Sequence, residues 1–284
     1  MADIRKVLTE HLRDLRLPTM RRQFEETARR AERETLSYEQ YLLELAQAEC
    51  EARRTSRIER LLRESRLPLN KNLETFDRQR LPVKVARQYQ TLLDGTFLDR
   101  HENVLLFGAT GSGKTHALCA LGQELIRRFC RKVLLCKCSL LVQELLAAKR
   151  DLKLAKVLRK LNGFEVLIID DIGYVQQSRE EMEVLFTLLA ERYERGSVLL
   201  TSNLPFSKWE QIFKDAMTTA AAIDRLVHHS VILELNIPSY RLEQARKAKE
   251  QADAEEPASA NPESEAAKKA KAMPKARTKR EAGE

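Results

Sequence analysis

The chain lacks any apolar run long enough to cross a membrane, which requires about 18 consecutive apolar residues. Its first residues, Met1 to Lys6, also lack the apolar core of a secretory signal peptide. From these two absences we expect neither a transmembrane helix nor a secretory signal peptide. We therefore expect a cytoplasmic protein with no membrane partner.

Cysteine and histidine do not form a metal-binding pattern. The sequence has five cysteines, an odd number, and its one C-x-C pair, Cys136 and Cys138, has no matching second pair. We interpret the cysteines as reduced, small apolar residues of a cytosolic protein. The neighbouring His228 and His229 have no third ligand at suitable spacing in the sequence, so we predict no metal site there.

Aromatic residues are scarce at both ends of the chain. Only Phe24, Tyr38, Tyr41 and Phe76 precede Pro82, which argues against a surface that stacks single-stranded bases. From about residue 251 aromatics are absent, and Ala, Glu, Lys and Pro dominate. Basic residues outnumber acidic ones, 50 to 42, and the net charge of +8 suits a polyanionic partner without proving one.

The most informative segment that is present is a glycine-rich run between an apolar strand pattern at 103–107 and a helical pattern that starts at about residue 114. Glycines let the backbone wrap around a polyphosphate, and the helix N-terminus adds its positive dipole end. Lys114 is expected to reach the β- and γ-phosphates, and Thr115 to bind Mg²⁺. We therefore predict an ATP site with these residues: Gly108, Ala109, Thr110, Gly111, Ser112, Gly113, Lys114, Thr115 and His116.

Two further apolar strand patterns end in polar residues. The first ends in Asp170 and Asp171: Asp170 is expected to enter the magnesium shell, and Asp171 to position or activate the attacking water. The Asp171 carboxylate lies one methylene closer to the backbone than that of a glutamate, which predicts slow hydrolysis. The second pattern, 197–202, precedes Asn203, which is a candidate to sense the γ-phosphate or hold the water.

Two arginines near the C-terminal end of this region have two open interpretations. Arg225 either stabilises charge on a transferring phosphoryl group, in cis or from a neighbouring subunit, or forms a surface pair with Asp224. Arg241 is a second candidate with the same ambiguity.

Apolar runs alternate with helical patterns over most of the chain, which predicts a parallel sheet covered by helices on both faces. The expected strands are 103–107, 132–137, 165–169, 197–202 and 230–235. The expected helices are 114–129, 139–149, 151–161, 178–194, 207–214 and 218–227. We predict the following organisation: helical domain 1–68, linker 69–82, nucleotide-binding domain 83–246 and disordered charged tail 247–284. The tail is either a solubilising segment or a basic arm for nucleic acid or a partner.

The helical N-terminal domain contains an arginine-rich helix that starts at a capping box, Ser37 to Gln40, and ends near Pro68. Arginines at helical spacing suit contacts with DNA phosphates that do not depend on base sequence. The alternative is a solvated face with internal pairs such as Glu49–Arg53 and Glu59–Arg63. The candidate DNA-contacting residues are Arg53, Arg54, Arg57, Arg60 and Arg63.

Together, these motifs resemble an AAA+ ATPase of the DnaA/DnaC clade, and more narrowly the IstB-like ATP-binding proteins that assist insertion-sequence transposition. The motifs that carry the resemblance are Gly-Ser-Gly-Lys-Thr-His at 111–116, Leu-Ile-Ile-Asp-Asp-Ile-Gly-Tyr at 167–174, Leu-Thr-Ser-Asn at 200–203, Asp-Arg-Leu-Val-His-His at 224–229 and Ser-Tyr-Arg at 239–241. The resemblance implies that Asn203 is sensor 1, that Arg225 is an arginine finger acting on the neighbouring subunit's ATP, and that Arg241 is sensor 2 in a minimal lid.

Three features depart from the family pattern: Ala109 stands where proline is usual, Asp171 stands where glutamate is common, and a long charged tail follows Arg246. The resemblance implies ATP-driven assembly of a homo-oligomer on double-stranded DNA, with ATP sites between subunits, and delivery of target DNA to a cognate transposase. The alternative is a DnaC-like helicase loader, whose main partner is a helicase and whose nucleic acid is single-stranded.

Overall fold

The computed structural model describes residues 3–173, 178–209 and 216–246. The predicted tail, 247–284, and residues 210–214 of the helix expected at 207–214 lie outside the described residues. The chain divides into two compact units, Met1–Tyr240 and Arg241–Glu284. The first unit contains every strand of the described part, and the second is described only over residues 241–246.

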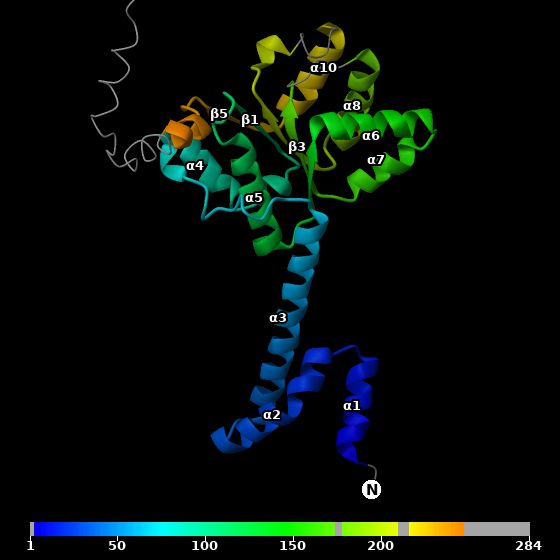
Figure 1. Ribbon diagram of the computed structural model, residues 1–284. Helices are drawn as coiled ribbons and strands as arrows, with labels where there is room; N and C mark the ends of the chain where they lie inside the picture. The colour runs from blue at the N-terminus through cyan, green and yellow to red at the C-terminus, as the bar shows by residue number, and fades with distance from the viewer. Residues whose placement is uncertain (1–2, 174–177, 210–215, 247–284) are drawn as a thin grey trace, which may run out of the picture. The chain divides into compact units, whose positions relative to one another are not determined.

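The central element of the first unit is a five-stranded parallel sheet with the strand order β2-β3-β4-β1-β5 (Figure 1). The strands are β1 (Asn103–Gly108), β2 (Val133–Lys137), β3 (Val166–Ile172), β4 (Ser197–Ser202) and β5 (Ser230–Leu235). All five strands were predicted, and the predicted fold class is confirmed. Because neighbouring parallel strands end at the same edge, this order brings the carboxyl ends of β1, β3 and β4 together.

Helices cover both faces of the sheet, and successive strand residues alternate between two apolar cores. On one face, Val104, Leu106 and Ile168 pack with α4 (Val83–Leu92), α5 (Lys114–Phe129) and the end of α3 (Tyr38–Glu64). On the other, Leu105 and Ile169 pack with four further helices. These are α6 (Cys138–Arg150), α7 (Leu154–Asn162), α8 (Arg179–Arg192) and α10 (Ala216–Val227).

Helix boundaries differ from the prediction where a non-glycine residue adopts positive φ. The helix expected from residue 151 begins at Leu154, because Leu152 has φ +58° and the chain forms a turn there. The strand expected to end at residue 169 continues to Ile172 through a register shift against β4. Pro82, expected in the first helical position, lies immediately before α4 as its N-cap residue.

The N-terminal part consists of α1 (Ile4–Asp14), α2 (Pro18–Glu34) and α3, as the helical periodicity predicted. The capping box at Ser37 and Gln40 is present. The buried carboxylate of Glu49 on α3 accepts the backbone N–H groups of Thr19 and Met20, at 2.8 and 3.1 Å, and the Nε–H of Arg53 at 2.9 Å. It therefore satisfies the orphan donors at the start of α2 and ties that helix to α3.

Residues 69–82, predicted as a linker, contribute buried side chains to the core around α5. Phe76 and Leu81 are 9% and 7% exposed, and Phe76 lies between Tyr89 and His116, with ring centroids 5.5 and 5.3 Å away. A short 3₁₀ turn, η1 (Arg78–Arg80), leads from this segment toward α4. The segment is thus packed on the sheet domain along much of its length.

All five cysteines are free, and Cys119, Cys136 and Cys138 are buried. Burial raises the pKa of the Cys119 thiol to about 12 and that of Cys136 to about 11, which keeps both thiols protonated. Among the described residues, no helix has both the length and the apolarity that a membrane span needs.

Candidate functional site

The glycine-rich run forms a tight turn between β1 and α5. Gly111 and Gly113 have φ of +83° and +92°, a region that glycine alone enters without strain. A Cβ on Gly111 would lie 2.1 Å from the Ser239 Oγ, so that close approach also requires glycine. The turn delivers the backbone N–H groups and the N-terminus of α5 to one point, which is the donor set that a polyphosphate needs.

Lys114 is the first residue of α5, and its side chain folds back over the turn. The Nζ group donates to the carbonyl oxygens of Gly108 and Ala109 at 2.8 and 2.9 Å, and the residue is 6% exposed. These bonds hold the ammonium group against the glycine-rich turn. The turn, the helix N-terminus and this cation together fit the polyphosphate of ATP.

Three side chains meet at the carboxyl ends of β3 and β4. The hydroxyl groups of Thr115 and Thr201 both donate to Asp170 Oδ1, at 2.8 and 2.7 Å. Asp170 is 5% exposed, so this carboxylate is held in one position by two short bonds. A hydroxyl and a carboxylate oxygen in contact are hard oxygen ligands of the kind that Mg²⁺ prefers, so Thr115 and Asp170 fit the magnesium role.

Asp171 has a different environment from its neighbour. Its φ is +62°, its backbone N–H donates to Thr201 Oγ1 at 2.8 Å, and the residue is exposed. The left-handed conformation coincides with the register shift between Ile169 and Ile172. The two adjacent carboxylates therefore differ: Asp170 is buried and bonded, whereas Asp171 faces solvent.

The remaining candidates lie at separate places. Asn203 follows β4 directly and is exposed. Arg225, near the end of α10, is partly buried, and its guanidinium carbon lies 4.6 Å from the Phe186 ring centroid. Its Nη1 is buried without a hydrogen-bond partner in the described part of the chain. Arg241 is exposed and is the first residue of the second unit.

His116, predicted to contact the nucleotide, lies against the segment that precedes α4. Its Nε2 is 3.1 Å from both the Thr75 hydroxyl and the Asn72 carbonyl oxygen. Burial lowers the pKa of His116, while the bond to Asn72 acts in the opposite direction. The first turn of α5 is thereby connected to residues 72–76.

The arginines of α3 fall into two groups. Arg53 bonds Glu49, as one of our two interpretations expected, and also donates to the Arg16 carbonyl. Arg54 donates to the carbonyl oxygens of Arg127 and Arg128 near the C-terminal end of α5. The members of the second group are exposed toward the C-terminal end of the helix: Arg57, Arg60 and Arg63.

Two contributors to the site were not predicted. Thr201 bonds the Asp170 carboxylate and the Asp171 N–H, but its role depends on β3 and β4 being neighbours. The backbone N–H of Tyr240 donates to the Gly111 carbonyl at 3.0 Å, which places residues 239–240 against the glycine-rich turn. The only sequence signal for Thr201 was its position in a polar strand end.

The protein has a five-stranded parallel sheet, a glycine-rich turn after β1, a bonded Thr–Asp pair and a polar end of β4. These features define a P-loop ATPase of the AAA+ class. The chain belongs to the family of IstB-like ATP binding proteins, whose model matches residues 10–248.

Relatives with the same description cover most of the chain. An insertion-sequence ATP-binding protein of Sinorhizobium fredii is 41% identical, over 84% of this chain and 80% of that protein. The IS5376 ATP-binding protein of Geobacillus stearothermophilus is 36% identical, over 85% of this chain and 96% of that protein. The resemblance stated from the motifs is confirmed.

Solved structures of lower identity share the fold. The DnaC helicase loader superposes with a TM-score of 0.52 at 16% identity and covers 60% of this chain and 98% of its own. Domain III of the Thermotoga maritima replication initiation protein DnaA gives 0.51 at 17% identity, over 64% and 73% of the two chains. These similarities support the AAA+ architecture alone.

Proposed function

We propose that this chain is an ATP-dependent DNA-binding protein that oligomerises on duplex target DNA and delivers it to a transposase. The main support is the hydrogen-bonded Thr115–Asp170 pair beside the glycine-rich turn. The family relatives of the chain are named as insertion-sequence ATP-binding proteins. An insertion sequence is mobile DNA, so an ATPase that serves it acts on DNA and on the enzyme that moves it.

In this proposal, the turn from Gly108 to Gly113 and Lys114 hold the β- and γ-phosphates of ATP. Thr115 and Asp170 would hold Mg²⁺, which would supply positive charge to neutralise the phosphates. Asp171 accepts a proton from the attacking water, and its solvent-facing position supports that role. Asn203 orients the water from the neighbouring strand end.

The ATP sites lie between subunits in the proposed assembly. Arg225 acts on the ATP of the neighbouring subunit, and Arg241 acts on the ATP of its own. The buried, unpartnered Nη1 of Arg225 among the described residues supports a guanidinium that is not committed to a fixed ion pair. To reach a neighbour, this side chain would leave the Phe186 ring.

The proposed DNA surface includes the arginine-rich helix α3. Exposed Arg57, Arg60 and Arg63 suit phosphate contacts, whereas Arg53 and Arg54 combine such contacts with their bonds inside the chain. We place the protein in the bacterial cytoplasm, associated with the nucleoid when it is bound to DNA.

The test is binding of the full chain to duplex and to single-stranded DNA, with and without a non-hydrolysable ATP analogue, while particle size is followed by light scattering. We expect large particles only with duplex and nucleotide together, and none with Lys114→Ala, whose cation is removed. A preference for single strands, or a need for a helicase, would replace the proposal with the helicase-loader interpretation.

A further inference from the structure

The sheet edge remote from the glycine-rich turn carries a cluster of metal-binding side chains. Glu194, His228 and His229 each offer one ligand atom, and these atoms lie within 4.8 Å of one another. Glu194 follows the end of α8, and the two histidines follow the end of α10. Two segments that are more than thirty residues apart in the sequence therefore converge on one exposed point.

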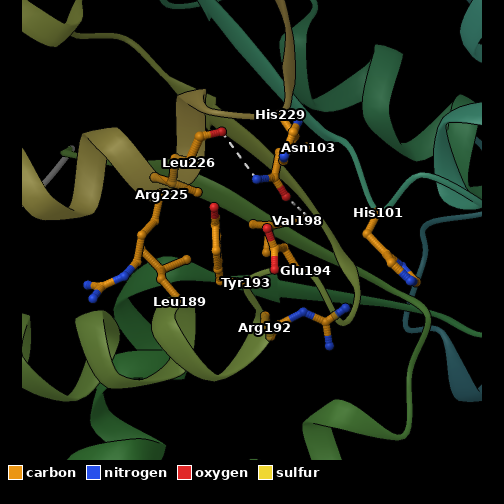
Figure 2. A pocket seen from close by; sticks show the side chains of 10 residues that line it. All are labelled: His101, Asn103, Leu189, Arg192, Tyr193, Glu194, Val198, Arg225, Leu226 and His229. Carbon is orange, nitrogen blue, oxygen red and sulfur yellow. Dashed lines mark hydrogen bonds between the residues drawn. The ribbon is translucent and has the colours of Figure 1, made fainter.

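Hydrogen bonds from the start of β1 fix the backbone of the histidine pair. The Asn103 N–H donates to the His229 carbonyl at 2.7 Å, and its Nδ2 donates to the Leu226 carbonyl at 3.1 Å. Its Oδ1 accepts the Val198 N–H at 2.8 Å, so one side chain joins the starts of β1 and β4 to the turn after α10 (Figure 2). The ligands thus project from a rigid base.

The local field favours a cation. Helices α8 and α10 both end here, at Arg192 and Val227, and each contributes the negative end of its dipole. The Arg192 guanidinium opposes this, but it is buried and donates to the carbonyl oxygens of Leu161, Phe164, Glu165 and Ser197. The Arg225 guanidinium extends away from Asn103 and His229 in Figure 2. Its central carbon lies 4.6 Å from the Phe186 ring centroid.

A neighbouring phenol orients one of the histidines. The Tyr193 hydroxyl lies 2.8 Å from His228 Nδ1. With the Nδ1–H tautomer of His228, the phenol oxygen accepts this bond and Nε2 keeps its lone pair for a metal. A hydrogen bond at the second ring nitrogen is the usual way in which a ligating histidine is held.

We propose that Glu194, His228 and His229 form a zinc-type divalent metal site, with water in the fourth position. Two imidazoles and one carboxylate are a ligand set that Zn²⁺ accepts in tetrahedral geometry. The site lies at the amino ends of β1, β4 and β5, whereas the glycine-rich turn follows the carboxyl end of β1. A bound metal would link the C-terminal end of α8 to that of α10. Helix α10 also carries Arg225.

Local spacing in the sequence offers no third ligand beside His228 and His229. Glu194 precedes the pair by more than thirty residues and becomes its neighbour only through the packing of α8 against α10. Its φ of +58° is an uncommon backbone conformation for glutamate, and no propensity scale would predict a ligand there.

The test uses the full chain, treated with a chelator and then titrated with Zn²⁺ by calorimetry and with Co²⁺ by visible absorption. We expect one equivalent per chain and a tetrahedral Co²⁺ spectrum without a thiolate charge-transfer band. Glu194→Gln and His228→Gln should each weaken binding by at least about tenfold. His101→Gln is the matched control, because His101 lines the small pocket that Glu194 and His229 also line (Figure 2) but lies outside the cluster, and it should bind as the wild type does.

A second readout separates loss of the site from loss of the fold. Zn²⁺ should raise the thermal unfolding midpoint of the wild type but not of the two cluster variants, while all three unfold at similar temperatures without metal. The proposal is overturned if the wild type binds no stoichiometric Zn²⁺, if the cluster variants bind normally, or if a thiolate band appears on Co²⁺ addition.

Discussion

At the scale of single residues, the positive φ of Asp171 and its proposed role toward water make different demands on the length of its side chain. Its φ of +62° belongs to a region where Asp and Asn are enriched among non-glycine residues because their short polar side chains bond locally. The same conformation turns Asp171 to solvent while Asp170 stays buried. The shorter acid therefore suits the backbone, and its carboxylate reaches one methylene less far than that of a glutamate would.

We predict that Asp171→Glu raises the rate of ATP hydrolysis by a few-fold, to about tenfold at most, because the carboxylate reaches farther. It should also lower the free energy of unfolding by about 1 kcal/mol, because glutamate is less favourable at positive φ. Steady-state hydrolysis and chemical denaturation measure the two effects.

The matched control is Asp171→Asn, which suits the backbone but accepts no proton, and it should hydrolyse ATP much more slowly than the wild type. An unchanged rate in Asp171→Glu would mean that another step limits turnover.

At the scale of elements, the structure connects the first turn of α5 with residues 72–76. His116 contributes a polar contact to Asn72 and Thr75 and a ring contact to Phe76. The ring of Phe76 also lies 3.6 Å from the position that a Cβ on Gly113 would occupy. The segment that joins α3 to α4 is thus packed against the first turn of α5, which directly follows the glycine-rich turn.

This connection should depend on pH. Burial lowers the pKa of His116 below its ordinary value of 6.5, so the folded chain favours the neutral ring. Above pH 6.5 the His116 ring is neutral in both the folded and the unfolded chain, so it causes no change in stability with pH. As the pH falls below 6.5, the unfolded chain takes up the proton first, and the free energy of unfolding decreases.

The thermal unfolding midpoint of the wild type should therefore fall more steeply than that of His116→Gln between about pH 7 and pH 5.5, since glutamine cannot titrate there. His101→Gln, which retains His116, serves as the control and should follow the wild type. Parallel profiles for wild type and His116→Gln would refute the assigned role of the ring.

The sequence predicted the strands and most helices because apolar runs and capping residues are local signals. Four features were not accessible in this way. The boundary shifts at α7 and β3 follow from positive φ at Leu152 and Asp171, which residue type does not specify. The roles of Thr201 and Glu194 depend on which strands and helices are neighbours, and neither periodicity nor spacing contains that information.

At the scale of the whole molecule, a modest net charge of +8 makes the local arrangement of arginines more important than the total. Arg53 is bonded to Glu49, and Arg54 is bonded to two carbonyl oxygens of α5. Arg60 Nε lies 4.0 Å from Glu64 Oε1. That last pair is exposed, so solvent screens it and little free energy opposes its exchange for a phosphate. We therefore expect Arg57, Arg60 and Arg63, near the C-terminal end of α3, to dominate the salt-dependent part of DNA binding.

Replacing Arg57, Arg60 and Arg63 with glutamine should weaken duplex binding and lower the slope of log affinity against log salt by about 3, since each phosphate contact contributes about 0.9. Fluorescence anisotropy across a salt series, with the ATP analogue present, measures both quantities. The control replaces three exposed arginines of the sheet domain, Arg150, Arg159 and Arg195, and removes the same charge. If both triple variants lose slope equally, binding follows net charge rather than α3, and the proposed DNA surface is wrong. If only the α3 variant loses slope while its DNA-independent hydrolysis is unchanged, the arginines act on DNA and not through the nucleotide site.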